Sequence, residues 1–163
     1  MRLQVKPKRW MCLVTSFAMA LDIPVSEAIE RLGHDGSRRL WPHLPEPLCR
    51  RGFHPQELID LCRFYGYAVT RVELCPRIAP AQDEQPVPIL DDAHAWSRFE
   101  DILQTSFGVI EGVGRECGHA VAYDRGHIFD PDGRNYAYLR IGCEARGFYV
   151  RHLWRLDPIG AVA

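Results

Sequence analysis

A cysteine opens an almost wholly apolar run near the start of this chain. The residues from Cys12 to Leu21 have the composition of a buried helix that begins near Cys12. The first turn of a helix presents unpaired backbone N–H groups and a partial positive charge, both of which favour a thiolate over a thiol. The sequence therefore places Cys12 where sulfur becomes nucleophilic, although a cysteine that only packs in a core would have the same neighbours.

A histidine and two acids lie far downstream of Cys12, in the segment 118–133. A cysteine nucleophile needs a base to take its proton, and the base needs an acceptor that fixes its tautomer. These groups are usually far apart in sequence and close in space. We predict that His119 is the base and that Asp130 is the orienting acid.

A β-hairpin would bring His119 and an acid together. If Arg125-Gly126 forms a two-residue turn, His119 lies diagonally beside Asp130 on the same face of the hairpin. The same register places Asp132 directly opposite His119, so Asp132 is the rival acid. We favour Asp130, because Pro131 holds it extended at a strand end. A three-residue loop would shift the register and turn Asp130 to the other face.

A metal site is another interpretation of the same region. Cys117 and His119 could form such a site with Cys143 and His152, but Cys-x-His is not a zinc-finger or zinc-ribbon spacing. The sequence has no glycine-rich phosphate loop, nucleophile-elbow serine or zinc-deaminase signature. We therefore expect neither a metal nor another cofactor.

Length and composition bound the remaining possibilities. The chain has 163 residues, of which 47% are hydrophobic, so we predict one compact domain over residues 1–163. Its 20 basic and 21 acidic residues leave a formal net charge of −1, without the basic field that marks nucleic-acid binding.

Membrane and export signals are missing from the sequence. No apolar run reaches the ~18 residues of a membrane span, and the N-terminus lacks the pattern of a secretory signal. The six cysteines are irregularly spaced and form no C-x-x-C pair, so we interpret them as free thiols. We therefore expect a cytoplasmic protein that binds neither a membrane nor nucleic acid.

Apolar periodicity predicts helices in the first part of the chain and a β-rich remainder. Helices are expected near 12–21, 25–32, 55–65 and 93–104, after a short strand near 3–5. Strands are expected over 67–74, 107–113, 119–123, 127–130, 136–141 and 148–156. Two proline-rich loops, 34–54 and 75–92, are expected to flank a cleft. Helices packed on an antiparallel sheet make an α+β domain.

Several short motifs accompany the three candidate residues. A short second helix ends in Leu32-Gly33, and a later helix ends in the run Phe64 to Tyr67 and leads into a strand. Gly118-His119-Ala-Val is followed by Phe129-Asp130-Pro131. With Cys12 at its helix start, this order resembles the papain-like cysteine peptidases of the bacteriocin-processing type. That family cleaves leader peptides after a double glycine and includes stand-alone relatives.

The resemblance covers roughly residues 1–132 and implies a papain-like fold. It also implies a catalytic triad with Cys12 as nucleophile, His119 as base and Asp130 as orienting acid. The Asp-Cys-Gly-Pro surroundings usual for the nucleophile are replaced here by Trp10-Met11-Cys12-Leu13-Val14.

The family's oxyanion-stabilising glutamine is also replaced. That glutamine lies six residues before the cysteine, where this chain has Lys6, while Gln4 lies eight residues before it. We predict that Gln4 serves together with the Cys12 backbone N–H, provided that the chain bulges between Val5 and Met11.

These features together predict a papain-like thiol hydrolase (a thiol protease, or cysteine peptidase). It would cleave a peptide, isopeptide or other amide bond of a peptide or protein substrate through an acyl-thioester on Cys12. The main alternative is a non-catalytic papain-fold module that binds a peptide or partner protein in the same cleft, which Lys6 in place of glutamine favours. An acyl or amide transferase that uses the same groups is a third possibility.

Overall fold

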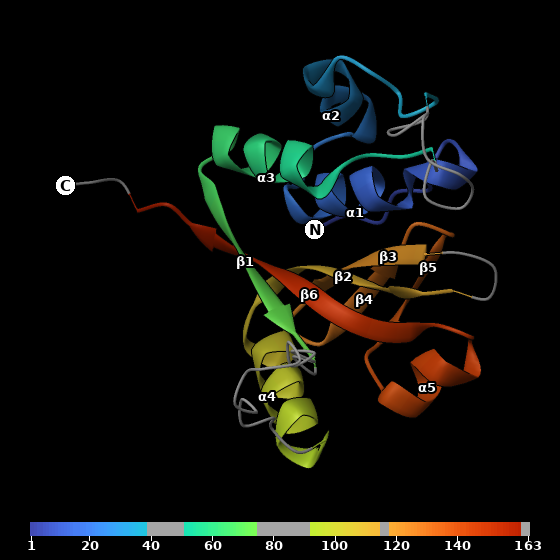
Figure 1. Cartoon of the computed structure of the whole chain (residues 1–163), viewed down its shortest axis with the longest axis vertical. Helices are drawn as coiled ribbons and strands as arrows, with labels where there is room; N and C mark the ends of the chain where they lie inside the picture. Colours follow the sequence, from blue (N-terminus) through green and yellow to red (C-terminus); the bar gives the residue numbers. More distant parts are fainter. Residues whose placement is uncertain (39–50, 75–91, 115–117, 161–163) are drawn as a thin grey trace, which may run out of the picture.

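The computed structural model of the chain describes residues 1–38, 51–74, 92–114 and 118–160 (Figure 1). Its centre is a six-stranded antiparallel sheet with the strand order β1-β6-β2-β3-β4-β5. The strands are β1 (Tyr67–Glu73), β2 (Phe107–Val113), β3 (Gly118–Asp124), β4 (His127–Asp130), β5 (Arg134–Ala137) and β6 (Tyr149–Pro158). The predicted α+β class is confirmed.

Helices cover both faces of this sheet. The helices are a 3-10 turn η1 (Arg9–Met11), α1 (Cys12–Ala20), α2 (Val25–Leu32), α3 (Pro55–Phe64), α4 (Asp92–Thr105) and α5 (Arg140–Ala145). Figure 1 shows α1, α2 and α3 on one side of the sheet and α4 and α5 on the other. The nucleophile helix α1 is therefore one layer of a three-layer arrangement.

Side-chain alternation along the central strands explains the two covered faces. Val109 of β2 is fully buried in the cluster formed by α1, α2 and α3, and its neighbour Ile110 is fully buried in the cluster that includes α4. Leu153 and Trp154 of β6 divide between the same two clusters. Because successive side chains of a strand point to opposite faces, a strand with apolar residues at adjacent positions needs a helical layer on each side.

Local signals set the bounds of α2 and α3. Pro24 is extended before α2, and Gly33 ends that helix in the left-handed conformation with φ 74°. Pro55 occupies the first turn of α3, and His54 and Glu57 form a reciprocal capping box there. The predicted bounds of the helix over 25–32 are confirmed.

The hairpin between β3 and β4 has the predicted two-residue turn. Asp124 pairs with His127 across it, and Arg125 and Gly126 both have positive φ values, 43° and 79°. Such a turn matches the twist of the flanking strands. Because the side-chain period of a strand is two, this register decides which residues of β3 and β4 share a face.

Two predicted strands are wrong in whole or in part. Residues 3–5 form no strand. Leu3 and Val5 are exposed, and Gln4 between them is hydrogen bonded to the connection between α1 and α2 and to the first residue of α2. The segment predicted as a strand over 136–141 contributes only its first residues to β5, and α5 then begins at Arg140. The helical turn of α5 places Cys143 in the same buried cluster as Tyr138, which a continued strand would not do.

The two proline-rich loops lie largely outside the described residues, at 39–50 and 75–91. Their predicted place beside the cleft is therefore not described. In the described ranges no single helix is long and apolar enough to cross a membrane. The segments Arg9–Ala20 and Val25–Leu32 meet those criteria only when taken together, across a bend of 108°.

Candidate active site

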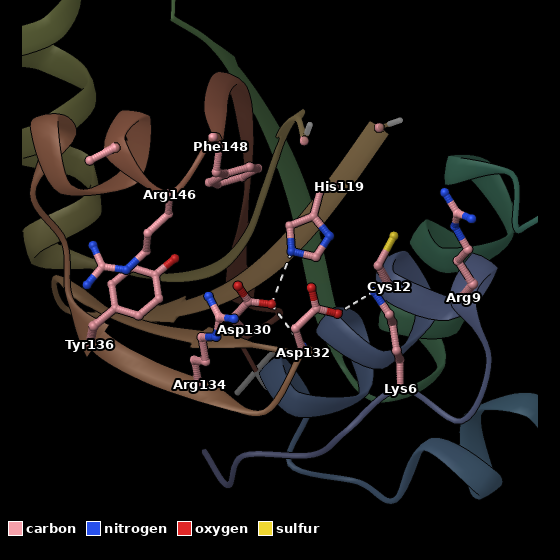
Figure 2. Close-up of a pocket in the computed structure, with 14 residues that line it drawn as sticks. Lys6, Arg9, Cys12, His119, Asp130, Asp132, Arg134, Tyr136, Arg146 and Phe148 are labelled. Carbon is pink, nitrogen blue, oxygen red and sulfur yellow. Dashed lines mark hydrogen bonds and ion pairs between the residues drawn. The ribbon is translucent and has the colours of Figure 1, made fainter. Parts of the chain in front are cut away.

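Cys12 lies at the start of α1, on the wall of an open cavity of about 510 Å³. The single turn η1 precedes it, and within that turn the Met11 N–H donates to the Lys8 carbonyl. His119, at the beginning of β3, and Asp130, at the end of β4, line the same cavity (Figure 2). Segments far apart in the sequence thus bring the three predicted residues to one place.

His119 is held between an acid and a thiol. Its Nε2 lies 3.0 Å from Asp130 Oδ1, and the two side chains are only 14% and 12% exposed. The second ring nitrogen, Nδ1, points toward the Cys12 sulfur (Figure 2), and the interaction with Cys12 also raises the pKa of the imidazole. The Phe148 ring packs edge-on against the imidazole at 5.5 Å between centroids. These contacts orient the ring and give each of its two nitrogens a different partner.

The protonation of His119 follows from these contacts. Burial acts to lower its pKa, but the hydrogen bonds to Asp130 and Cys12 outweigh that effect and raise the pKa from 6.5 to about 9. The imidazole is therefore positively charged at neutral pH. A positively charged imidazole beside a cysteine is one of the surroundings in which reactive cysteines are found.

Asp130 is the anionic partner in this group. Burial acts to raise the pKa of its carboxyl, but hydrogen bonds from His119 and from the Asp132 backbone N–H hold that pKa below its usual value. The Asp132 N–H donates to Asp130 Oδ1 at 2.9 Å. The Lys6 ammonium lowers the pKa further through its charge. A carboxylate that stays ionised can hold an imidazolium over a wide range of pH.

Asp132, the rival acid, has a different partner. Its carboxylate forms an ion pair with Lys6 Nζ, and Figure 2 shows this pair beside Cys12. The Lys6 backbone N–H donates to the Pro131 carbonyl at 2.9 Å, so the N-terminal segment is tied to the end of β4. The structure thus brings Asp130, and not Asp132, into hydrogen-bonding contact with His119.

Gln4 does not lie at the cavity, which corrects the sequence-based prediction. Its side-chain amide donates to the Ile23 carbonyl at 2.7 Å and accepts the Val25 N–H at 2.9 Å. Gln4 therefore joins the N-terminal segment to the connection between α1 and α2. Lys6, two residues later, lines the cavity instead.

The alternative zinc set does not assemble in the described part of the chain. Cys143 is the buried residue of α5, and burial raises the pKa of its thiol. His152 lies 2.8 Å from a Glu111 carboxylate oxygen on another part of the sheet. Cys117 lies outside the described residues.

A different group of residues could in principle bind a metal. Ligand atoms of His119, Asp130 and Asp132 lie within 4.8 Å of one another. The Lys6 ammonium and the imidazole of His119 already supply positive charge to these two carboxylates. Each of the two carboxylates therefore already has a partner within the site.

The cavity also has a second wall that sequence reasoning missed. Arg134 and Tyr136 of β5 line it, together with Arg146, which follows α5 (Figure 2). The sequence contains a signal for Arg134 and Tyr136. When β4 and β5 pair, Arg134 lies opposite Asp130, and Tyr136, two residues further along β5, lies on the same face as Arg134. Arg146 could not be placed, because the sequence pattern predicts no helix there.

No protein-family model matches the chain, and no curated protein matches it. The chemistry of the site therefore rests on its own geometry.

Proposed function

We propose that this protein is a papain-like thiol hydrolase that cleaves a peptide, isopeptide or other amide bond through an acyl-thioester on Cys12. The observation that carries the proposal is the position of His119 between Asp130, whose Oδ1 lies 3.0 Å from Nε2, and the Cys12 thiol, toward which the other ring nitrogen points (Figure 2). A histidine that only packs in a core also needs partners for its ring nitrogens, but those partners need not include an accessible thiol. A histidine fixed between a carboxylate and an accessible thiol has the arrangement of a nucleophile, base and orienting acid.

The reaction follows from these three groups. The Cys12 thiolate attacks the carbonyl carbon of the scissile amide, and the carbonyl electrons move onto oxygen. The His119 imidazolium gives its proton to the leaving nitrogen, the C–N bond breaks, and the acyl group remains on Sγ as a thioester. Water then attacks the thioester and gives a proton to His119, and the acid product leaves with restoration of the thiolate. One water is consumed for each bond that is broken.

Lys6 is the group that we propose for stabilisation of the negative oxygen in both tetrahedral intermediates. Its ammonium lies at the wall of the cavity beside Cys12 and is held by Asp132 (Figure 2). A positive charge aimed at the developing oxyanion supplies the electrostatic stabilisation that backbone and amide donors supply elsewhere. In this proposal Asp132 orients Lys6, while Asp130 orients His119.

The papain-like assignment is supported by the placement of nucleophile and base. Cys12 begins a helix whose buried residues pack on one face of an antiparallel sheet, and His119 begins a strand of that sheet. The sequence resemblance to bacteriocin-processing peptidases favours the same assignment. A function that depends on a free thiol also suits the reducing cytoplasm, where we propose that the protein acts.

One observation favours a non-catalytic peptide-binding module as the second candidate. The amide of Gln4 is hydrogen bonded away from the cavity, so no glutamine among the described residues lines the cavity as a donor for an oxyanion. If Lys6 does not stabilise an oxyanion, the same cavity would bind a peptide without cleaving it.

The two candidates are separated by a test for the acyl-enzyme. An activated ester such as p-nitrophenyl acetate should release a burst of p-nitrophenolate equal to the protein concentration and leave one acetyl group on Cys12, located by mass spectrometry. The Cys12→Ala variant should show neither. A protein that folds normally but gives no acetyl-Cys12 would contradict the hydrolase and favour the binding module.

A further inference from the structure

The wall of the cavity opposite Cys12 is positively charged. Arg134 of β5 and Arg146 after α5 both line the cavity, and both residues are exposed. The chain as a whole carries a formal net charge of −1. The positive wall is therefore a local feature and not the consequence of a basic protein.

The acids of the cavity do not neutralise this wall. Asp130 is engaged by His119 Nε2, and Asp132 forms its ion pair with Lys6. In the ranges that the structure describes, no carboxylate forms an ion pair with Arg134 or Arg146. Two guanidinium groups thus remain with positive charge that the cavity itself does not balance.

Arg146 is held in place by its neighbours. Its guanidinium carbon lies 4.5 Å from the centroid of the Tyr136 ring, and its Nη1 donates to the Gly142 carbonyl at 2.7 Å. Arg134 lies opposite Asp130 in the register of β4 and β5, so its side chain extends from the strand pair that carries the orienting acid. A guanidinium with a fixed plane loses less freedom when it binds a carboxylate than a freely rotating one does.

We propose that the substrate carries a carboxylate close to the scissile bond, and that Arg134 and Arg146 bind this carboxylate. This inference rests on the proposed hydrolase function. A planar carboxylate matches the forked donors of arginine, whereas a neutral or basic group would leave both guanidinium groups without an anionic partner in the occupied cavity. The carboxylate can belong to an acidic side chain or to a chain terminus, which share this chemistry.

A pair of alkylating reagents tests the charge at Cys12. Iodoacetate and iodoacetamide react by the same displacement, but only iodoacetate is anionic, so the ratio of their rates at Cys12 reports the local potential. We expect the ratio of the iodoacetate rate to the iodoacetamide rate to fall about two- to five-fold in the double variant Arg134→Gln, Arg146→Gln. This fall corresponds to the interaction energies that are usual for exposed ion pairs. High salt should reduce the wild-type ratio in the same direction. Arg63→Gln, at an exposed position of α3 outside the cavity, is the matched control and should leave the ratio unchanged.

Two results of this measurement have different meanings. If both reagents label Cys12 rapidly but the double variant keeps the wild-type ratio, the carboxylate proposal is overturned while the hydrolase proposal stands. If neither reagent labels Cys12 faster than buried Cys62, the hydrolase proposal fails first, and the inference that rests on it fails too. Arg134→Gln alone, at an exposed position, gives the same readout with a smaller change if Arg146→Gln prevents folding.

Protection by small peptides identifies the source of the carboxylate. Three acetylated tripeptides are compared for their ability to slow iodoacetamide labelling of Cys12: Gly-Glu-Gly amide, Gly-Gln-Gly with a free C-terminus, and neutral Gly-Gln-Gly amide. We expect one of the two acidic peptides to protect at a concentration several-fold lower than the neutral peptide, and this preference to be lost in the double arginine variant. Protection by the first peptide indicates an acidic side chain, and by the second a chain terminus. Equal protection by all three, or none by any, would overturn the proposal.

Discussion

Asp130 Oδ1 lies 3.0 Å from His119 Nε2, and the same oxygen accepts the Asp132 backbone N–H at 2.9 Å. The second hydrogen bond fixes the carboxylate, and the carboxylate in turn fixes the imidazole. The other ring nitrogen is thereby left for Cys12. Reactivity at Cys12 should consequently depend on a carboxylate that does not itself touch the sulfur.

Asp130→Asn should lower the reactivity of Cys12 far more than Asp132→Asn. Loss of the orienting carboxylate leaves nucleophile and base in place but removes the acceptor that selects the tautomer, a change that costs up to ~10⁴ in the rate of a serine triad. We expect about 10- to 1,000-fold here, because a thiolate–imidazolium pair depends less on the third member. The measurement is the rate of Cys12 acetylation by p-nitrophenyl acetate at neutral pH.

Asp132→Asn is the matched control, since it removes a neighbouring carboxylate that contacts Lys6 and not His119. It should lower acetylation less than Asp130→Asn and leave iodoacetamide labelling nearly unchanged. The opposite order of the two variants would show that Asp132 orients the histidine in solution.

The imidazole of His119 should titrate well above an ordinary histidine. Its pKa is raised from 6.5 to about 9, against the effect of burial, by hydrogen bonds to Asp130 and Cys12. Nuclear magnetic resonance of the His119 ring should give a midpoint near that value, and Asp130→Asn or Cys12→Ala should each lower it. A wild-type midpoint at or below 6.5 would contradict the thiolate–imidazolium pair.

The same shift predicts a pH dependence of stability. Because the pKa is higher in the folded state, the charged imidazole stabilises the fold fully below pH about 6.5, and this contribution is lost as the pH rises through about 9. The stability difference between the wild type and His119→Gln should therefore become smaller across that interval. Urea unfolding at several pH values measures it.

Cys12 should alkylate much faster than Cys62 and Cys143. Cys62 is fully buried and its pKa is raised to about 12 by burial, and the pKa of buried Cys143 is also raised. Cys12 is only half-buried and lines the open cavity beside His119. Iodoacetamide at pH about 7 with mapping of the labelled peptides should show at least a 100-fold preference, about the effect of two pKa units. Equal labelling of Cys12 and Cys62 is the outcome that counts against catalysis.

Lys6→Met should separate activation of the thiol from stabilisation of the oxyanion. Acetylation of Cys12 passes through a tetrahedral oxyanion, whereas displacement on iodoacetamide does not. Loss of one oxyanion donor costs about 10²–10³ in rate, and we expect about 10- to 100-fold because Lys6 is partly solvated. Acetylation should therefore fall while alkylation stays within about three-fold. Lys6→Arg, which keeps the charge, should restore part of the acetylation rate; equal losses in both reactions would assign Lys6 a structural role.

Gly112 should not tolerate a side chain. It pairs with His119 across β2 and β3 and lies at a bulge where β2 meets β6. A Cβ there would clash with the Tyr149 carbonyl oxygen and lie 2.9 Å from the Phe148 ring, so backbone would have to move. We expect Gly112→Ala to destabilise the protein by about 1–3 kcal/mol, as overpacking does. Thermal unfolding measures this loss, and Gly118→Ala, where a Cβ would meet nothing closer than 4.0 Å, should unfold near the wild-type temperature.

Several parts of this protein were determined by short stretches of sequence. Gly33 ends α2 in the left-handed conformation, and Arg125-Gly126 forms the turn that places His119 beside Asp130. Helix ends and two-residue turns depend on the backbone conformations of adjacent residues, so they can be read from the local sequence. The association of Cys12 with these residues followed from chemistry, since a thiol nucleophile requires a base and the base an acceptor.

Only the tertiary structure decided which partners the remaining polar groups take. The sequence could not predict the ion pair of Lys6 with Asp132 or the hydrogen bond of Gln4 with the start of α2, because both contacts join segments that are distant in the chain. The charged wall formed by Arg134 and Arg146 depends on the pairing of β5 with β4 and on the turn to α5. Such contacts arise when apolar faces pack and bring surface residues from distant segments together. The packing energy comes from the assembled core, so no single segment specifies these contacts.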